Sequence, residues 1–456
     1  MRKENKMGTM PVGKLLFSIA LPMIISMLVQ ACYNIVDSYF VAQLSEDALT
    51  AVSLAFPVQN LMIAITSGTG VGINALLSRS LGEKNFKTAN KAATNGLFLA
   101  LLSYGLFLLF GLFGARIFFE AQTDDPEIIE YGVEYLSIIC TVGFGMIGQM
   151  TLERLLQSTG RSIYSMITQT TGAVINIIMD PIMIFGLLGM PKMGVAGAAV
   201  ATVLGQCVAM VMAFIFNVKK NPDIRLNLRT FRPEGSIIKK IYAVGLPSIA
   251  MLSIGSIMTF GMNSILLGFS TTAAAVFGVY FKLQSFVFMP VIGLNNAVVP
   301  IVSYNYGARN RSRITKTLKL GMLSAFGIMC IGVAAMQLFP RELLSIFNAS
   351  QNMLDIGEFA LRIISLHFPI AAFSIIMVSS FQALGNGVLS LIASAARQLL
   401  VLLPAAFLLA KFFGLNAVWW SFVVAEVVCL VLSALLLRRL YKKKILPMDT
   451  PVSAGA

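Results

Sequence analysis

The chain carries the sequence Asn176-Ile-Ile-Met-Asp180-Pro181 inside an apolar run from about 161 to 188, long enough to cross a membrane. A carboxylate in hydrocarbon costs about 3 kcal/mol or more and usually faces a bundle interior or a wet cavity. On a helix the Asn176 amide shares the face of Asp180, and Pro181 removes a backbone donor and favours a kink. An aspartate that reaches water at a helix end is the alternative. We interpret Asp180 as half of a cation site.

Composition places the whole chain in a membrane. It has 456 residues, of which 57% are hydrophobic and 12% charged, and most of it consists of apolar runs longer than a span. A net charge of +14 would suggest nucleic acid for a soluble protein. Here the basic residues lie in short loops, so membrane orientation explains them and no nucleic-acid partner is expected. The five cysteines lack paired spacing and are predicted to be buried thiols without disulfides.

We predict an all-α polytopic protein with twelve transmembrane helices. They lie near residues 15–43, 48–80, 92–118, 127–157, 161–188, 193–218, 238–268, 272–304, 315–339, 352–384, 388–413 and 415–440.

Charge alternates between successive loops. The N-terminus and the loops after the second, fourth, sixth, eighth and twelfth helices carry basic residues, whereas the loop around Glu46 and the loop from Glu120 to Glu130 are acidic. By the positive-inside rule both termini are cytoplasmic. The apolar stretch after Lys14 is too long for a signal peptide and indicates an uncleaved first span. We expect a multi-pass protein of the cell membrane.

The two halves of the chain repeat. The polar linker 219–240 separates them, and matching residues recur at one offset of 225, or of 220 for the last helix of each half. The sequence predicts an N-lobe (1–218), a linker (219–240), a C-lobe (241–445) and a cytoplasmic tail (446–456). Six helices per half give both lobes the same orientation, so their pseudo-twofold axis runs along the membrane normal and substrate binds between them. The matched pairs are Pro22 with Pro247, Gln59 with Gln284, Lys84 with Arg309, Gly160 with Gly385, and Gly194 with Gly414.

The membrane-embedded aspartates occur only in the first half. At the 225 offset, Asp37 corresponds to Met262, and Asp180 to Ala405 or a position near it. Two carboxylates in one pocket cannot both ionise cheaply, so they share a proton or coordinate a cation. The Asn176 amide and the Thr202 hydroxyl add hard oxygen ligands suited to Na⁺. We therefore expect an ion-coupling site for H⁺ or Na⁺, with no other cofactor.

A polar stripe leads to Asp37 along the first helix. Gln30, Tyr33 and Asn34 precede it by seven, four and three residues. Asn34 is placed with the ion-coupling residues. The candidate substrate-cavity residues are Gln30, Tyr33, Gln59, Tyr280, Gln284 and Met289.

The chain resembles the multidrug and toxic compound extrusion (MATE) family, in particular its DinF-like branch, over about 14–440. The resemblance rests on the two six-helix halves, on Asn-Ile-Val-Asp-Ser-Tyr-Phe-Val at 34–41 and on Asn-Ile-Ile-Met-Asp-Pro at 176–181. It implies a V-shaped, two-lobed bundle that exports cationic amphipathic compounds in exchange for H⁺ or Na⁺. The matched ion ligands are Asp37, Asn176, Asp180 and Thr202, with Glu153 as an N-lobe glutamate. The NorM-like branch has acidic residues in the seventh and tenth helices, which this chain lacks in mid-helix, so an N-lobe site is favoured.

Several residues keep two interpretations. Glu153 could form an ion pair near the interface with Arg154 or Arg161 instead of serving the ion site. Lys282 and Arg397 are cations of the C-lobe that could snorkel, or pair with Glu426. His367 is expected to be packed and not a proton relay.

Other classes of protein fit less well. A lipid-linked oligosaccharide flippase shares the architecture but would need more helices and a strongly cationic cavity. An ion channel would need filter residues. The sequence shows no nucleophile–base pair and no metal-ligand cluster, so it does not indicate an enzyme. It has no nucleotide-binding motif, so it does not indicate an ATP-driven pump. We expect a monomer in the bilayer that acts on small cationic molecules.

Overall fold

The structure is a computed structural model that describes residues 4–226, 231–347 and 349–449, and these form helices and no strands. Ten of the helices are long and apolar enough to cross a membrane, and two bent helix pairs bring the total to twelve. The protein is thus an all-α, multi-pass membrane protein, as the sequence predicted. Arg2, Lys3, part of the linker (227–230) and most of the tail (450–456) lie outside the described residues.

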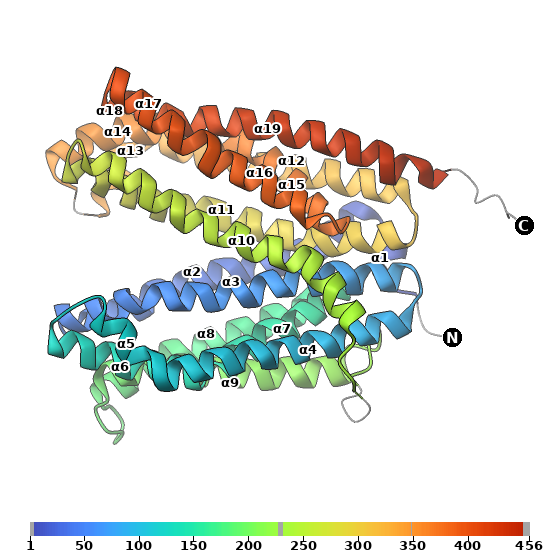
Figure 1. Cartoon of the computed structure of the whole chain (residues 1–456), viewed down its shortest axis with the longest axis horizontal. Coiled ribbons are helices and arrows are strands. Elements are labelled where there is room, and N and C mark those ends of the chain that lie inside the picture. The colour runs from blue at the N-terminus through green and yellow to red at the C-terminus, as the bar shows by residue number, and fades with distance from the viewer. Residues whose placement is uncertain (1–3, 227–230, 348, 450–456) are drawn as a thin grey trace, which may run out of the picture. The chain divides into compact units, whose positions relative to one another are not determined.

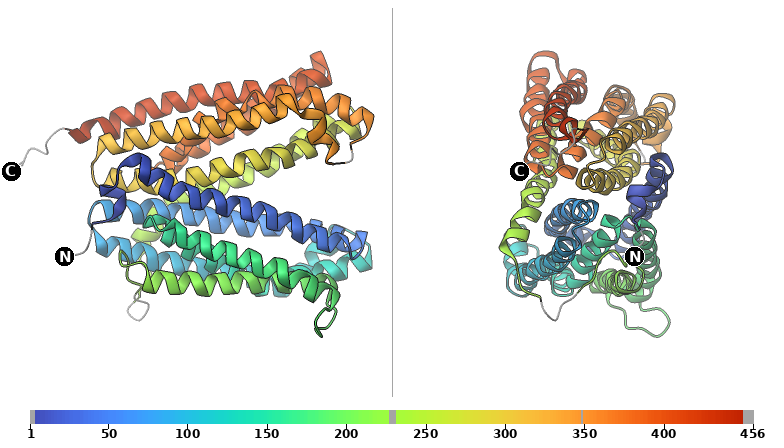
Figure 2. Two further views of the ribbon diagram at one scale, coloured as in Figure 1. Left: turned by 180° about the vertical axis from the view of Figure 1, so that it is seen from behind. Right: turned by 90° about the vertical axis from the view of Figure 1, so that its right-hand side faces the viewer.

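The helices form two compact units (Figures 1 and 2). The N-unit comprises Ile25–Leu81 and Asn85–Gly245, and the C-unit comprises the remaining described residues. The N-unit contains the second part of α2 (Val12–Ala42), α3 (Glu46–Gly82) up to Leu81, and the first part of α10 (Gly235–Leu267). It also holds α4 (Phe86–Leu109), η1 (Phe110–Gly114), α5 (Ala115–Glu120), α6 (Pro126–Thr141), α7 (Phe144–Ser158), α8 (Ser162–Phe185) and α9 (Gly194–Lys219).

The C-unit holds the second half of the repeat. It contains the first part of α2 and the second part of α10. Its other helices are α1 (Lys6–Thr9), α11 (Thr271–Gly307), α12 (Arg311–Leu338), α13 (Pro340–Ser345), α14 (Gln351–Ser365), α15 (Phe368–Ala383), α16 (Gly387–Ala395), η2 (Ala396–Leu402), α17 (Leu403–Phe413), α18 (Leu415–Val418), α19 (Trp420–Leu440), η3 (Tyr441–Ile445) and η4 (Leu446–Asp449).

The first helix of each half passes from one unit into the other. Helix α2 leaves the C-unit after Ile24, and α10 leaves the N-unit after Gly245. A proline lies close to each crossing, Pro22 in α2 and Pro247 in α10, and the two are 225 residues apart (247 − 22 = 225). The compact units are therefore not simply the two halves of the sequence, and the lobe boundaries given above stay a prediction.

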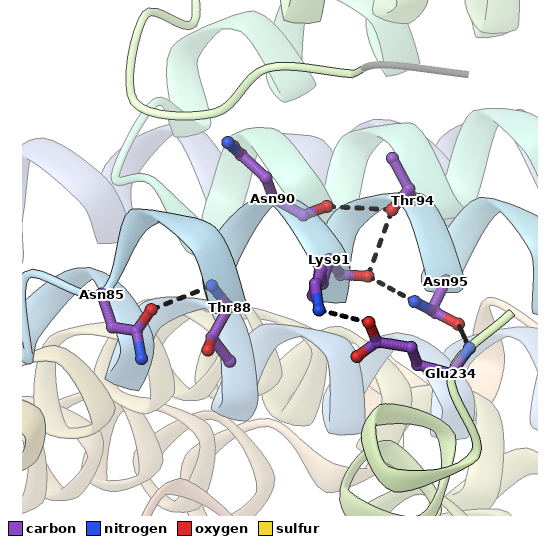
Figure 3. Close-up of polar contacts among 7 residues, drawn as sticks. All are labelled: Asn85, Thr88, Asn90, Lys91, Thr94, Asn95 and Glu234. Carbon is purple, nitrogen blue, oxygen red and sulfur yellow. Dashed lines mark hydrogen bonds and ion pairs between the residues drawn. The ribbon is translucent and has the colours of Figure 1, made fainter. Parts of the chain in front are cut away.

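The segments ahead of these crossing helices are docked on the opposite half. Within the C-unit, Arg313 of α12 donates to the carbonyl oxygens of Met7 at 2.9 Å and Met10 at 2.7 Å, at the end of α1. Within the N-unit, the linker is held against α4 (Figure 3). The backbone N–H of Glu234 donates to Asn95 Oδ1 at 3.0 Å, and its carboxylate pairs with Lys91.

Unusual backbone angles reproduce the sequence repeat. Lys84 and Arg309 both have positive φ, at 56° and 55°, although neither is a glycine. Two further matched pairs are glycines with positive φ, Gly160 with Gly385 at the 225 offset and Gly194 with Gly414 at the 220 offset. Positive φ is uncommon, so its recurrence at the predicted offsets supports the repeat.

Hydrogen bonds and helix breaks repeat as well. Ser78 Oγ donates to the Ser158 carbonyl at 2.8 Å, and Ser303 Oγ, 225 residues later, donates to the Ala383 carbonyl at 2.9 Å. The bend between α6 and α7 is 43°, and that between α14 and α15 is 47°. Each half is thus built on one helix plan, although the π-helical turns η1 and η2 have no matching π-helical turn in the other half.

Candidate ion-binding site

Close packing of α8 on α9 builds one wall of the site. A Cβ added at Gly205 would lie 2.5 Å from the Gly172 carbonyl oxygen, so only glycine lets the two backbones approach this closely. Asn176 lies one turn beyond Gly172, and Thr202 lies three residues before Gly205. The glycine contact therefore brings the polar side chains of the two helices together.

Asn176 is the centre of this polar group. Its Nδ2 donates to Asp180 Oδ1 at 3.3 Å and to Thr202 Oγ1 at 3.1 Å. Asp180 is fully buried, and Asn176 and Thr202 are almost so. The four-residue spacing predicted this face of α8, and the structure places Thr202 with it.

Helix α2 contributes the second carboxylate. Asp37 is close enough to Asp180 for the two to interact electrostatically. Tyr33, one turn earlier, lies within reach of the Thr202 side chain. The structure therefore brings Asp37, Asn176, Asp180 and Thr202 into one cluster, with Tyr33, a predicted cavity residue, at its edge.

The cluster has more acceptors than donors. Asp37 Oδ1, Asn176 Oδ1 and Asp180 Oδ2 are buried and have no hydrogen-bond partner within the described part of the chain. Buried polar atoms are normally paired, so three unpaired oxygens in one cluster need explanation. A proton shared by the carboxylates, or a cation held by the oxygens, would supply positive charge to such a cluster.

The cluster fits a small hard cation and not a transition metal. Among residues 4–226, 231–347 and 349–449, no group of three or more His, Cys, Asp or Glu side chains could hold a metal ion. The available ligands are two carboxylates, an amide carbonyl and a hydroxyl. Such oxygens suit a hard cation such as Na⁺, or the site can take a proton.

Gln59 and Tyr135 form a second polar layer. Gln59 Nε2 donates to Tyr135 Oη at 3.0 Å, and Tyr135 interacts electrostatically with both aspartates. Gln59 was predicted to line the substrate cavity, whereas Tyr135 was not predicted at all. Apolar side chains close the site beyond this layer, among them Val41, Ile184 and Val203.

Two other residues of the polar stripe lie away from the cluster. Gln30 accepts a hydrogen bond from Gln169 Nε2 at 3.0 Å, about two turns before Asp37. Asn34 is exposed and is not among the residues that contact the carboxylates. The structure thus does not bring Asn34 into the ion cluster.

Glu153 occupies a separate buried position. Its Oε1 accepts hydrogen bonds from Gln149 at 3.0 Å and from Thr168 at 2.8 Å. Thr168 precedes Asp180 by twelve residues, or roughly 18 Å along α8. The predicted pairing with Arg161 is not formed, because Arg161 pairs with Asp223 at 3.2 Å. Glu153 is therefore not a ligand in the cluster of Asp37 and Asp180.

The C-unit has no equivalent of the aspartate cluster. Met262, the counterpart of Asp37, is fully buried, and Ala405 and Phe422 stand at the counterparts of Asp180 and Thr202. Within the part of the chain that the structure describes, these matched positions therefore carry the aspartates in the first half and apolar residues in the second.

The charged and polar residues predicted in the C-unit serve other contacts. Arg397 Nη1 pairs with Glu426 Oε2 at 3.3 Å, which confirms the ion-pair interpretation, while Lys282 is exposed and lies 5.7 Å from the centre of the Phe347 ring. His367 is packed against aromatic rings, as predicted. Tyr280 is fully buried among aromatic side chains, and Gln284 and Met289 are half-buried.

The family model for MatE matches this chain twice, over residues 22–182 and 247–408. The two matches begin 225 residues apart (247 − 22 = 225), which is the offset of the repeat. Together they cover well over half of the chain. The chain therefore belongs to the MatE family, and it is a membrane transporter and not an enzyme.

Curated relatives match over nearly their full length. A multidrug export protein MepA from Staphylococcus haemolyticus (strain JCSC1435) is 26% identical over 423 residues, covering 92% of each chain. The protein of the same name from Staphylococcus aureus (strain NCTC 8325 / PS 47) is 26% identical over 450 residues, covering 96% of each.

Solved structures share the fold. An outward-facing multidrug resistance MATE family transporter of the MOP superfamily has a TM-score of 0.91 and 27% identity, with 97% of this chain and 99% of that one covered. A MOP superfamily transporter from Pyrococcus furiosus Vc1 (DSM3638), described as having a binding pocket of reversed polarity, has a TM-score of 0.88 and 26% identity, with 99% and 100% covered.

Proposed function

We propose that this protein is a secondary multidrug efflux transporter of the cell membrane, with both termini in the cytoplasm. It exports cationic amphipathic compounds in exchange for H⁺ or Na⁺. The curated relatives named as multidrug export proteins support the efflux function. The observation that carries ion coupling is the cluster of three buried, unpaired oxygens on Asp37, Asn176 and Asp180.

In this proposal the two aspartates change charge as the ion binds. Without an ion, two neighbouring carboxylates repel each other and favour a wetter, more open pocket. A proton or Na⁺ removes the repulsion and lets α2, α8 and α9 close around the cluster. Asn176 keeps Asp180 and Thr202 in place, and Tyr33 brings the polar stripe of α2 to the same point.

Competition between ion and drug follows from this arrangement. The closed cluster has lost the negative charge that attracts a cationic drug, so the two ligands weaken each other's binding. By thermodynamic linkage the effect is equal in both directions.

The test is a flux assay in proteoliposomes with ethidium and imposed pH or Na⁺ gradients. An inwardly directed gradient of the coupling ion should drive ethidium out against its own gradient. Ethidium movement that ignores both gradients would contradict ion-coupled export. Faster movement of a lipid-linked sugar without ethidium transport would favour the flippase. A flippase of this kind would need a strongly cationic cavity. Arg397, one of the two cations that favoured it, is neutralised by Glu426.

A further inference from the structure

A basic pocket lies at the end of the membrane spans of the C-unit. It has a volume of about 640 Å³ and lies between the first turns of α12 and the start of η3. Its lining residues are Arg311, Ser312, Thr315, Lys316, Lys319, Leu320 and Tyr441. Three are basic, three carry hydroxyl groups, and none is acidic.

Tyr441 holds the arginine of this pocket in place. Arg311 Nε donates to Tyr441 Oη at 3.0 Å, and the guanidinium carbon lies 5.6 Å from the ring centre. Thr315 Oγ1 is 3.2 Å from the same hydroxyl group. Arg311, Thr315 and Lys319 follow one another at four-residue spacing, so they share one face of α12. A pre-positioned arginine beside free lysines is suited to binding an oxyanion.

The lysines of the pocket are not neutralised by the protein. Neither Lys316 nor Lys319 takes part in an ion pair within the described ranges 4–226, 231–347 and 349–449. At the matching position of the first half, Lys91 (316 − 91 = 225) pairs with Glu234 of the linker (Figure 3). The same helix plan therefore carries a paired lysine in one half and an unpaired one in the other.

The other two basic residues of the pocket have no basic counterpart in the first half. Arg311 corresponds to Phe86 and Lys319 to Thr94 (311 − 86 = 225; 319 − 94 = 225). The repeat folds without basic residues at these two sites. Their presence in α12 is therefore not required by the helix packing.

The position of the pocket, at the ends of two candidate membrane spans, indicates the kind of ligand that it binds. Helix α12 is a candidate membrane span that begins at Arg311, and the last candidate span runs from Leu415 to Met448, with Tyr441 close to its end. The pocket thus lies where lipid head groups meet the protein, and Lys442 and Lys443 beside it are exposed. Basic pockets between spans bind anionic head groups. We propose that this pocket binds the phosphate head group of an anionic phospholipid.

The test is a titration of the purified full-length protein with phosphatidylglycerol, read by native mass spectrometry, with phosphatidylcholine as the neutral lipid. The variant Lys316→Gln/Lys319→Gln removes two pocket charges. Each basic residue near an anionic lipid contributes about a factor of five, so we expect the dissociation constant to rise roughly thirtyfold. The matched control Lys219→Gln/Lys220→Gln removes two exposed lysines at the end of α9 and should stay within about threefold of the wild type.

A second variant tests the arginine separately. Tyr441→Phe removes the hydroxyl group that accepts from Arg311 and should weaken phosphatidylglycerol binding several-fold. Unchanged melting midpoints for all variants would show that the fold is intact.

Three results would overturn the proposal. They are equal binding of both lipids by the wild type, equal weakening by both double variants, and displacement of the lipid by millimolar inorganic phosphate, which would identify a soluble anion as the ligand.

Discussion

Asn176 donates its amide group to Asp180 Oδ1 at 3.3 Å from one turn earlier on α8. The same amide group reaches Thr202 on α9, so a single side chain fixes both a carboxylate and a hydroxyl group. Its own carbonyl oxygen and Asp180 Oδ2 stay unpaired. Asn176 therefore orients the site while leaving free the oxygens that an ion would use.

Replacing either aspartate should uncouple drug from ion. In the wild type we expect drug affinity in detergent to fall on the order of tenfold as the coupling ion saturates. In Asp37→Asn and Asp180→Asn the fall should be less than about twofold, because the charge that responds to the ion is gone. Fluorescence binding titrations at varied pH and Na⁺ measure this. The exposed control Glu46→Gln should behave like the wild type, and a steep ion dependence in either aspartate variant would exclude the cluster as the coupling site.

Removing the Asn176 side chain should destabilise the protein. Asn176→Ala leaves Asp180 Oδ1 and Thr202 Oγ1 without their common donor, which costs about 1–3 kcal/mol for buried groups. We expect a lower melting midpoint and loss of the stabilisation that the coupling ion gives. Ile178→Ala on the exposed face of α8 is the control, with little effect expected. If Asn176→Ala has the same melting midpoint as Ile178→Ala and is still stabilised by the coupling ion, Asn176 does not orient the ion site.

Glu153 should affect stability and not coupling. Glu153→Gln keeps an acceptor for Thr168 and Gln149, so we expect a change of about 1 kcal/mol or less in unfolding free energy. The ion dependence of drug binding should match the wild type, because Thr168, the α8 partner of Glu153, lies roughly 18 Å along that helix from Asp180. The same binding titration checks this. If drug affinity no longer depends on the coupling ion in Glu153→Gln, then Glu153 takes part in coupling.

Replacing only one residue of the Arg397–Glu426 pair should destabilise the protein more than replacing both. Glu426→Gln or Arg397→Met leaves one charge uncompensated, and we expect about 3 kcal/mol of destabilisation because Glu426 is buried. The double variant Arg397→Met/Glu426→Leu should recover most of it. Chemical unfolding of the three variants measures the difference. Additive losses in the double variant would show that the two side chains do not act as a pair.

Arg313 should hold α1 in place. In Arg313→Gln the carbonyl oxygen of Met10 loses its donor and that of Met7 keeps only Asn305 Nδ2, so we expect amide exchange in residues 7–10 to speed up by on the order of tenfold. Hydrogen exchange read by mass spectrometry gives the rates. The neighbouring exposed Arg309→Gln is the control, and unchanged exchange in both variants would mean that other contacts hold α1.

The sequence was informative where residues repeat or share a helix face. The 225 offset predicted the repeat, which the shared positive φ of matched residues supports, and four-residue spacing predicted that Asn176 and Asp180 lie together. Tyr135 was not predicted as a site residue, because its contact with Gln59 joins residues 76 positions apart and no local sequence pattern encodes such a contact. Arg154, next to Glu153 in the sequence, interacts with it electrostatically, as one of the two interpretations of Glu153 expected. The hydrogen bond from Gln149, one turn earlier, was not predicted.

The exchange of α2 and α10 between the units also has a consequence for biosynthesis. Residues 235–245 complete the N-unit, yet they are translated after all of its other helices. The segment up to Ile24 emerges first but finds its packing partners only when α11 and α12 have been made. Neither unit can finish folding on the ribosome before the second half begins to appear. The two halves should therefore mature together, and a chain truncated after α9 should expose unfilled packing surface to quality-control proteases.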